Sequence, residues 1–437
     1  MKKKRLKKKW MIGFLFLLLL IILLIGYLST AKKENEKEQE KKDEENIVEK
    51  VSKKLENIDY DFLKWVKENY PNSLEKMYPL LENSYEESLW HKVTGYSYQV
   101  LKDLYEKKYE NEKNVTMLNT KNKAILSFVG DVSLADNWFI MPEYDRRGKG
   151  IYGILSEEIV KIMTESDLMV ANSEFTVSNR GSAMPGKQYT FKASPTRLSI
   201  YKEMGVDLVT LANNHVYDFG QDAFLDMLDS FDEIHMPRIG AGRNLEEAMK
   251  PYYFIINGYK FAFLNATRAE KYILTPGATE TSEGVFRCYD RENLLNQIKK
   301  VKAESDYVIT ILHYGKEGYH TLEEEQIASS KAYLDAGSDV IVGHHAHVLQ
   351  GIEFYNHKPI IYNLGNFIFN SETIDTAIFQ IEVKEDGTFN YYMIPALQKN
   401  EYTSLLTGEE KERVIHNLNS WSINAIIEED GQLLEKP

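Results

Sequence analysis

The sequence predicts an α/β fold, in which a layered β-sheet is covered by helices and extended by antiparallel strands. After residue 123, six short apolar runs have the length of buried strands, and helical patterns lie between several of them. Strands that alternate with helices usually pair in parallel and bury both faces of the sheet. With 437 residues, 43% of them hydrophobic and 12% aromatic, the chain is not largely disordered.

The predicted elements follow in chain order. Strands are expected at Ala124–Val129, Asp167–Ala171, Asp207–Leu211, Phe261–Asn265, Tyr307–Leu312 and Asp339–Val342. Helices are expected at Gly220–Phe231, Glu292–Val301 and Glu323–Ala336, with another near Lys411–Leu418. Two pairs of runs predict the antiparallel strands, Ile352–Tyr355 with Pro359–Asn363, and Ala377–Lys384 with Phe389–Ile394.

The N-terminus predicts a membrane anchor. Seven of the first nine residues are Lys or Arg, and a nearly unbroken apolar run covers residues 10–28. About 20 apolar residues cross a bilayer, and flanking basic residues stay on the cytoplasmic side. We expect a single-pass anchor with a cytoplasmic N-terminus and an extracytoplasmic body. A cleaved signal peptide is the alternative, but the residues after the run match its A-x-A-like cleavage site poorly.

Composition shifts divide the chain further. We expect a basic tip (1–9), a transmembrane anchor (10–28), a charged stalk (29–57), a helical segment (58–120), the α/β domain (121–400) and a polar C-terminal tail (401–437). The helical segment is rich in aromatic residues at helical spacings such as Phe62–Trp65, which is typical of a packing face.

Charge and cysteine content exclude several functions. The net charge of the chain is −13, and leaving out the seven basic residues of the tip gives −20 for the remainder. Such an acidic body repels phosphate backbones, so we expect no nucleic-acid partner. The single cysteine, Cys288, excludes an internal disulfide and a cysteine-based metal cluster within one chain.

Polar side chains cluster where five predicted strands end, and ligands bind at the carboxyl ends of strands in layered α/β sheets. Three of the ten histidines fall within positions 344–347. Carboxylates, amide oxygens and imidazoles bind manganese, zinc or iron, so we expect one or two divalent ions there. The candidate ligands are Asp131, Glu174, Asn214, His313, His345 and His347. His215 is the candidate catalytic residue, because its imidazole can donate or accept a proton beside the metal.

These segments resemble the CapA family of poly-γ-glutamate capsule biosynthesis proteins, which is similar in fold to the calcineurin-like metallophosphoesterases. The strings that carry the resemblance are Phe128-Val129-Gly130-Asp131, Asn172-Ser173-Glu174, Leu211-Ala212-Asn213-Asn214-His215, His313-Tyr314-Gly315, Gly343-His344-His345-Ala346-His347 and Tyr362-Asn363-Leu364-Gly365-Asn366-Phe367. The resemblance implies a four-layer α-β-β-α sandwich and the same metal-binding and proton-donating residues. Ser133 stands where the superfamily has a histidine, and either His344 or His345 can supply the closing ligand.

The resemblance implies a membrane-anchored, extracytoplasmic component of poly-γ-glutamate synthesis or export. Its expected partners are the membrane, that polymer or another anionic surface polymer, and other membrane subunits of capsule synthesis. Because polymer and body are both acidic, basic residues should gather near the metal site. The candidates are Arg146, Arg147, Lys149, Arg180, Lys187, Lys192, Arg243 and Arg268. We assign substrate binding to Asn172, Arg268 and His344. The alternatives are an extracytoplasmic metal-dependent hydrolase unrelated to capsule and a non-catalytic binding module.

Overall fold

The computed structural model describes residues 23–33, 47–55, 57–81, 86–110, 112–118, 120, 122–270 and 274–437. They belong to two compact units, residues 1–94 and 95–437, which we treat separately. The boundary lies earlier than the expected one at residue 120. Helix α5 (Tyr98–Tyr105) and strand β1 (Val115–Met117) therefore belong to the second unit.

The first unit is helical where the structure describes it. Residues 23–33 and 47–54 are helical, and α2 (Tyr60–Asn69), α3 (Ser73–Leu80) and α4 (Ser88–Thr94) follow. The side chain of Trp90 is fully buried, and its ring centroid lies 5.6 Å from that of Phe62. These two aromatic residues of the helical segment therefore pack against each other.

The expected membrane span over residues 10–28 lies mostly outside the described residues, which include only 23–28 of it. This part is helical and its side chains are exposed, as at Leu23 and Tyr27. Among the described residues, no helix has both the length and the apolar character needed to cross a bilayer. The anchor therefore stays a prediction.

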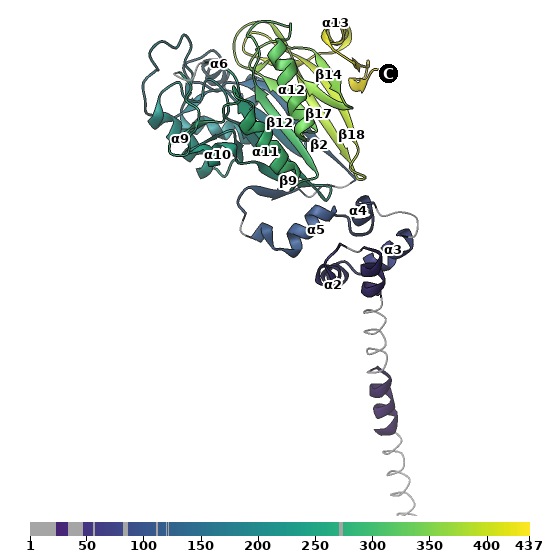
Figure 1. Cartoon of the computed structure of the whole chain (residues 1–437). Coiled ribbons are helices and arrows are strands. Elements are labelled where there is room, and N and C mark those ends of the chain that lie inside the picture. Colours follow the sequence, from purple (N-terminus) through teal and green to yellow (C-terminus); the bar gives the residue numbers. More distant parts are fainter. Residues whose placement is uncertain are drawn as a thin grey trace, which may run out of the picture. The chain divides into compact units, whose positions relative to one another are not determined.

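The second unit is built on two mixed β-sheets (Figure 1). In spatial order, the seven-stranded sheet contains β1, β9 (Tyr252–Ile256), β10 (Tyr259–Thr267), β12 (Tyr307–His313), β13 (Val340–His344), β15 (Lys358–Ile361) and β14 (Ile352–Tyr355). The main path of the ten-stranded sheet is β20 (Ala425–Ile427), β21 (Gln432–Glu435), β18 (Phe389–Gln398), β17 (Ile374–Lys384), β2 (Lys123–Val132), β3 (Leu168–Ser173), β6 (Leu208–Thr210) and β7 (Arg238–Ile239). Strand β16 (Asn366–Ile368) pairs with β2, and β19 (Thr403–Leu405) pairs with β18.

Helices cover the outer faces of the two sheets. Those on the seven-stranded side are α11 (Glu292–Lys302) and α12 (Glu324–Ala336), and α10 (Leu245–Met249) adds Ala248 to the same core. Those on the ten-stranded side are α6 (Ile140–Arg147), α7 (Glu157–Thr164), α8 (Ser199–Glu203) and α9 (Gln221–Glu233). Short two-residue ladders join β4 (Thr176–Val177) to β5 (Lys192–Ala193) and β8 (Ala241–Gly242) to β11 (Gly284–Val285).

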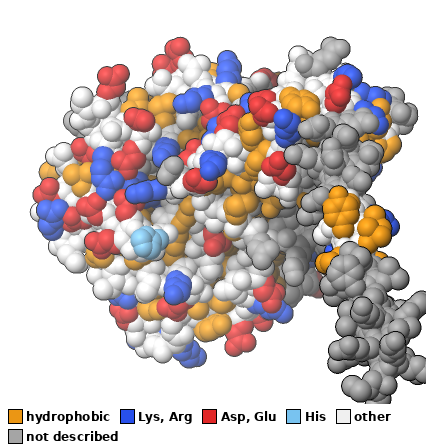
Figure 2. All heavy atoms as spheres, turned by 90° about the horizontal axis from the view of Figure 1, so that it is seen from below, with side chains coloured by type: hydrophobic (Ala, Val, Ile, Leu, Met, Phe, Trp, Pro, Cys, Tyr) orange, Lys and Arg blue, Asp and Glu red, His pale blue; other side chains and the backbone are white. Residues whose placement is uncertain are grey.

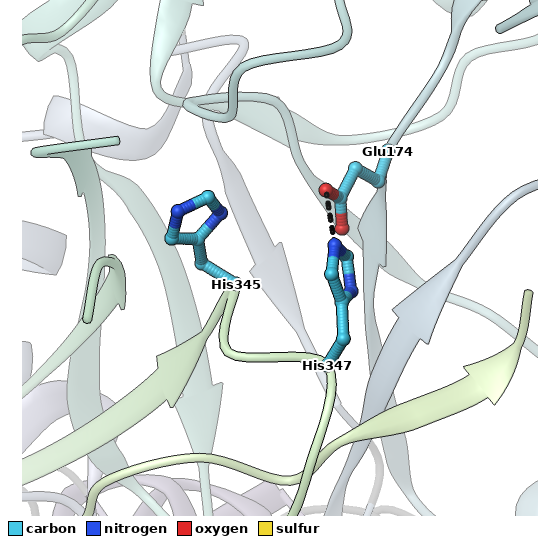
Figure 3. A group of neighbouring side chains, drawn as sticks. All are labelled: Glu174, His345 and His347. Atoms are coloured by element: carbon cyan, nitrogen blue, oxygen red, sulfur yellow. Dashed lines mark ion pairs between the residues drawn. The ribbon is translucent and has the colours of Figure 1, made fainter. Parts of the chain in front are cut away.

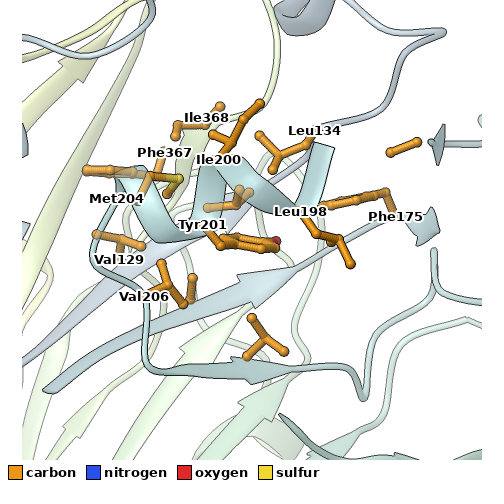
Figure 4. Close-up of a cluster of buried hydrophobic side chains, with 14 of the residues drawn as sticks. Val129, Leu134, Phe175, Leu198, Ile200, Tyr201, Met204, Val206, Phe367 and Ile368 are labelled. Atoms are coloured by element: carbon orange, nitrogen blue, oxygen red, sulfur yellow. The ribbon is translucent and has the colours of Figure 1, made fainter. Parts of the chain in front are cut away.

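The hydrophobic cores follow the alternation of side chains along the strands. On β10, Phe261 and Phe263 join a core that also contains β2, β3 and β17 of the other sheet, whereas Ala262 faces the core beneath α11 and α12. The core on the other outer face includes Tyr201 of α8, which is fully buried (Figure 4). The two sheets therefore pack face to face between helical layers.

All six predicted strands and the three predicted helices of the α/β region are present, with boundaries shifted by a few residues. The predicted helix near residues 411–418 lies within α13 (Gly408–Trp421). The C-terminal tail, expected as a separate polar segment, instead supplies β19, β20, β21 and α13 to the fold. Its apolar residues are too few and too scattered to give a clear pattern, yet Leu418 and Leu433 belong to the core between the sheets.

Candidate metal centre

The candidate site lies where parallel strands of both sheets end. Strands β2, β3 and β6 pair in parallel in one sheet, and β12 and β13 pair in parallel in the other. Their carboxyl ends or the loops that follow carry Asp131, Asn172, Glu174, Asn214, His215, His313, His344, His345 and His347. Each of these residues is buried except His347, which is half-buried.

A bulge in β2 directs Asp131 into the site. Phe128 lies in the core between the sheets and Val132 in the outer core, although regular alternation would place both on one face. The register between β2 and β3 shifts between Phe128 and Asp131, which accounts for the change. Asp131 therefore faces the side toward the other sheet. Next to it, a Cβ on Gly130 would collide with the carbonyl group of Gly365, so only glycine fits.

Asp131 contacts ligand candidates from two strands. Its Oδ1 accepts a hydrogen bond from Nδ2 of Asn172 at 2.8 Å and lies 3.2 Å from Nδ1 of His344. Its Oδ2 accepts from Nδ1 of His347 at 3.1 Å and from the backbone N–H of His345 at 3.3 Å. This carboxylate therefore joins the end of β3 to the loop after β13.

Glu174 is shared by two groups of side chains that could hold a metal ion. One group is Asp131, Glu174 and His313, and the other is Glu174, His345 and His347; within each, the ligand atoms lie within 4.8 Å of one another. Figure 3 shows the second group, with Glu174 and His347 directed toward each other. Oε1 of Glu174 is buried and has no hydrogen-bond partner, although Nε2 of His313 lies 3.5 Å away. A buried, unsatisfied carboxylate oxygen among imidazoles is the arrangement expected of a metal ligand.

The loop after β13 holds its histidines in an unusual backbone conformation. The φ angles of His345 and His347 are +95° and +59°, a region that residues other than glycine rarely adopt. Nδ1 of His347 donates a hydrogen bond to Oδ1 of Asn366 at 2.8 Å as well as to Asp131. Its Nε2 is therefore the nitrogen left for a ligand bond, as in metal sites where the second ring nitrogen is fixed by an oxygen. Strained backbone of this kind clusters at functional sites.

The two central carboxyl groups have opposite pKa shifts. Burial would raise the pKa of Asp131, but its contacts with His344 and His347 outweigh burial and hold the pKa well below its ordinary value. Burial, followed by the negative charges of Asp131 and Glu317, raises the pKa of Glu174 well above its ordinary value. A bound cation would favour the ionised form of both groups.

The neighbouring imidazoles are shifted as well. Burial, followed by the proximity of His345, lowers the pKa of His313 well below its ordinary value. Burial, followed by His347, lowers the pKa of His345 to about 3. Both side chains are therefore neutral at physiological pH, which is the form that binds metal ions. For His347, burial acts to lower the pKa, but the hydrogen bond to Asp131 outweighs it and raises the pKa.

His215 is oriented by a carboxylate. Its Nδ1 lies 2.7 Å from Oδ2 of Asp218, and its ring centroid lies 4.3 Å from that of Phe191. The neighbouring Asn214 accepts a hydrogen bond at Oδ1 from Nε2 of His313 at 2.7 Å. The structure therefore brings His215 beside the ligand group, with Nδ1 bound and Nε2 left for a substrate.

The three residues expected to bind substrate are placed differently. Asn172 and His344 are buried within the ligand group, where Asn172 also donates to Oε2 of Glu174 at 3.2 Å. Arg268 lies beside His313, whose carbonyl oxygen accepts from its backbone N–H at 2.9 Å. Its guanidinium is directed to Oε1 of Glu325 at 3.4 Å. Asn172 and His344 thus contact candidate ligands directly.

Three contacts in the site were not predicted from the sequence. Asn366 orients His347, Asp218 orients His215, and Lys187 binds Asp218. The only sequence signal that Asn366 belongs to the site is its place in one of the motifs that carry the family resemblance. For Asp218, the available sign of a contact is its spacing of three residues from His215.

Comparison with known proteins shows the family of this chain. A model of the family "Bacterial capsule synthesis protein PGA_cap" matches residues 125–371, more than half of the chain. The chain belongs to this family. The matched region contains every candidate ligand from Asp131 to His347.

Individual relatives are similar to this chain over the same region. The capsule biosynthesis protein CapA of Bacillus anthracis is 31% identical over 267 residues, which cover 59% of this chain and 64% of that protein. The PGA biosynthesis protein CapA of Bacillus subtilis is 29% identical over 315 residues, 70% of this chain and 80% of that protein. A probable polyglutamine synthesis accessory protein of Mycobacterium tuberculosis is 24% identical over 219 residues, 48% of this chain and 58% of that protein.

Proposed function

We propose that this PGA_cap-family protein is a membrane-anchored, extracytoplasmic component of poly-γ-glutamate capsule synthesis or export, and that its α/β unit binds a divalent metal. The observation that carries the proposal is the family match over residues 125–371, because that region holds the whole ligand group. The names of the two Bacillus relatives support the capsule role.

The ligand assignment follows the contacts. Asp131, Glu174, Asn214 and His313 would hold one ion, and Glu174, His345 and His347 would hold a second beside it, with Glu174 common to both. The mixture of carboxylate, amide and imidazole ligands suits manganese, iron or zinc. When bound, such a metal supplies Lewis-acid charge to an anionic group of the substrate.

The charge distribution gives the metal a second role. Six of the eight basic residues expected near the site have carboxylate partners within 4.0 Å: Arg146, Arg147, Arg180, Lys187, Arg243 and Arg268. Acidic neighbours therefore offset the charge of most of these residues, and a cationic rim around the site stays a prediction. On the face shown in Figure 2, basic and acidic side chains are likewise interspersed. Bound metal would then supply the positive charge that an anionic polymer requires.

Deleting the gene and restoring it with variants tests the capsule role. We expect the deletion strain to lose cell-surface poly-γ-glutamate, wild-type protein to restore it, and Asp131→Asn to fail. Asp335→Asn is the control, because Asp335 lies on α12 and accepts a hydrogen bond from the hydroxyl of Tyr355 at 3.2 Å, away from the ligand group. Unchanged polymer in the deletion strain would refute the proposal.

The anchor has its own test. The apolar run over residues 10–28 and the basic tip before it support a single-pass topology with the body outside the cell. We expect the protein in the membrane fraction and its α/β unit to be digested when protease is added to intact protoplasts. Protection of that unit until the protoplasts are lysed would contradict this topology.

A second candidate function is a metal-dependent hydrolase that acts on a phosphoester or a cell-wall polymer. The observation that favours it is the hydrogen bond between His215 and Asp218 beside the ligand group, since a histidine held in this way can protonate a leaving group. Hydrolysis of bis-p-nitrophenyl phosphate by the manganese-loaded protein, lost in His215→Ala, would support it. Equal rates in wild-type protein and His215→Ala would exclude His215 from that reaction.

A further inference from the structure

A buried ammonium group lies behind the candidate metal centre. The side chain of Lys187, in the loop between β4 and β5, is 2% exposed. Its Nζ lies 2.5 Å from Oδ1 of Asp218 and 2.9 Å from Oε2 of Glu270. It also donates to the carbonyl oxygen of Asn214 and to Oγ1 of Thr275, the latter at 3.4 Å. This one charge therefore joins the loop between β4 and β5 to the segments that follow β6 and β10, one from each large sheet.

Asp218 links Lys187 to His215, because its carboxylate contacts both side chains. The side chain of Asp218 is fully buried, and its two oxygens have different partners. Oδ1 binds Lys187, whereas Oδ2 accepts from Nδ1 of His215 and from the backbone N–H of Phe191, both at 2.7 Å. A carboxylate bound at both oxygens cannot rotate freely, so the direction of the imidazole is set by where Lys187 holds Asp218.

We infer that Lys187 is a positioning residue for the metal centre. It holds Asn214, a candidate ligand, through the backbone carbonyl, and it holds His215, the candidate proton donor, through Asp218. This inference rests on the proposed metal site. Lys187 was expected to meet an anionic polymer from the rim, but its burial and its two carboxylate partners assign it instead to the support of the Asn214–His215 pair.

The chain offers a matched control. Lys260 is also a buried lysine, 5% exposed, whose Nζ lies 2.7 Å from Oδ2 of the fully buried Asp103. Its ammonium additionally lies over the ring of Tyr253 at 4.4 Å. Lys260 lies at the start of β10, and its ammonium contacts Asp103 of α5 and Tyr253 of β9, away from the strand ends that carry the candidate ligands. Lys260→Met therefore breaks a comparable buried ion pair without touching the site.

The test compares Lys187→Met and Lys260→Met in the full-length protein in detergent. Titration calorimetry with Mn²⁺ measures metal affinity, and circular dichroism measures folding. We expect the Kd for Mn²⁺ to rise at least tenfold in Lys187→Met and to stay within twofold of wild type in Lys260→Met, because removing a residue that supports a ligand typically weakens metal binding 10–100-fold. An unchanged Kd in Lys187→Met, or an equal rise in Lys260→Met, would overturn the inference.

A second readout needs no metal. In ¹⁵N-histidine NMR spectra of the metal-free protein, the Nδ1–H signal of His215, assigned with His215→Gln, should shift or broaden in Lys187→Met and stay in place in Lys260→Met. An unmoved signal in Lys187→Met would overturn the inference. If Lys187→Met does not fold, Lys187→Met/Asp218→Asn removes both buried charges and is compared with Asp218→Asn alone. Equal Kd values and equal His215 signals in these two variants would overturn the inference. Should wild-type protein bind neither Mn²⁺ nor Zn²⁺, the proposed metal site fails and the NMR result alone decides the role of Lys187.

Discussion

Nε2 of His313 donates a hydrogen bond to Oδ1 of Asn214 at 2.7 Å, and this contact joins the two sheets at the candidate metal centre. His313 is the last residue of β12 in the seven-stranded sheet, whereas Asn214 follows β6 in the ten-stranded sheet. Because each sheet supplies only part of the ligand group, metal binding requires the two sheets to stay packed together.

His313 is expected to be a metal ligand. We expect His313→Ala to raise the Kd for Mn²⁺ or Zn²⁺ at least tenfold, because it removes a ligand and the partner of Asn214. Titration calorimetry on the purified protein measures this. His357→Ala is the control, since His357 is exposed and pairs with Glu435 at 2.7 Å. Equal affinity in His313→Ala and His357→Ala would remove His313 from the ligand set.

Replacing Glu174 should stabilise the metal-free protein but weaken its affinity for metal. Its pKa is raised by burial and by Asp131, so in metal-free protein this group costs stability as pH rises above its ordinary pKa of 4.5. We therefore expect Glu174→Gln to stabilise metal-free protein at pH 7.5 by about 1–2 kcal/mol. The same variant should bind metal at least tenfold more weakly. Urea unfolding with EDTA and with Mn²⁺ checks both, and a loss of stability in EDTA would contradict the burial argument.

Gly130 tests how the backbone positions Asp131. We expect Gly130→Ala to lower the free energy of unfolding by about 1–3 kcal/mol, because its Cβ would collide with the carbonyl group of Gly365. Metal affinity should fall as well, since the carboxylate of Asp131 would move with the strand. Gly153→Ala is the control, because its Cβ would meet the Arg147 side chain only at an ordinary 3.4 Å. Denaturant unfolding that shows equal stability for both variants would argue against this close approach.

Asp207, which lies outside the candidate ligand group, should make the stability of the protein depend on pH. Burial raises its pKa to about 6, although its Oδ2 accepts from the backbone N–H of Met169 at 2.8 Å. The folded state therefore binds this proton more tightly than the unfolded state, and stability contributed by Asp207 is lost as pH rises from about 4 to 6. We expect Asp207→Asn to be more stable than wild type by about 1–2 kcal/mol at pH 7.5 and nearly equal at pH 4. A difference that does not change with pH would contradict this.

Much of the fold could be predicted from local patterns. The six apolar strands carry nearly continuous hydrophobic runs because both faces of each strand are buried, as at Phe261 and Ala262 of β10. Residues Asp131, Glu174 and His313 could be singled out because they follow such runs directly. The role of the tail was not predictable, since its core residues, such as Val414, Leu418 and Leu433, are scattered through a polar segment.

The residues that hold the candidate ligands and His215 in place could not be predicted from local patterns. Lys187 and Asp218 are 31 positions apart and meet only because two loops fold over the same strand ends. A lysine in a loop with Gly and Pro is ordinarily solvated, so its burial depends on tertiary contacts that no local pattern reveals. Asn366 likewise reaches His347 because β16 pairs with β2 in parallel, which places residue 366 opposite Asp131.

The metal content of the purified protein shows directly whether the candidate ligands bind an ion. Full-length protein purified after growth with manganese, iron and zinc, then dialysed, is analysed by inductively coupled plasma mass spectrometry alongside Asp131→Asn and Glu174→Gln. We predict about one or two equivalents of a divalent transition metal in the wild type, consistent with two ligand groups that share Glu174, and a clear loss in both variants. Wild-type protein without bound metal above background, or with the same content as both variants, would contradict metal binding at this site.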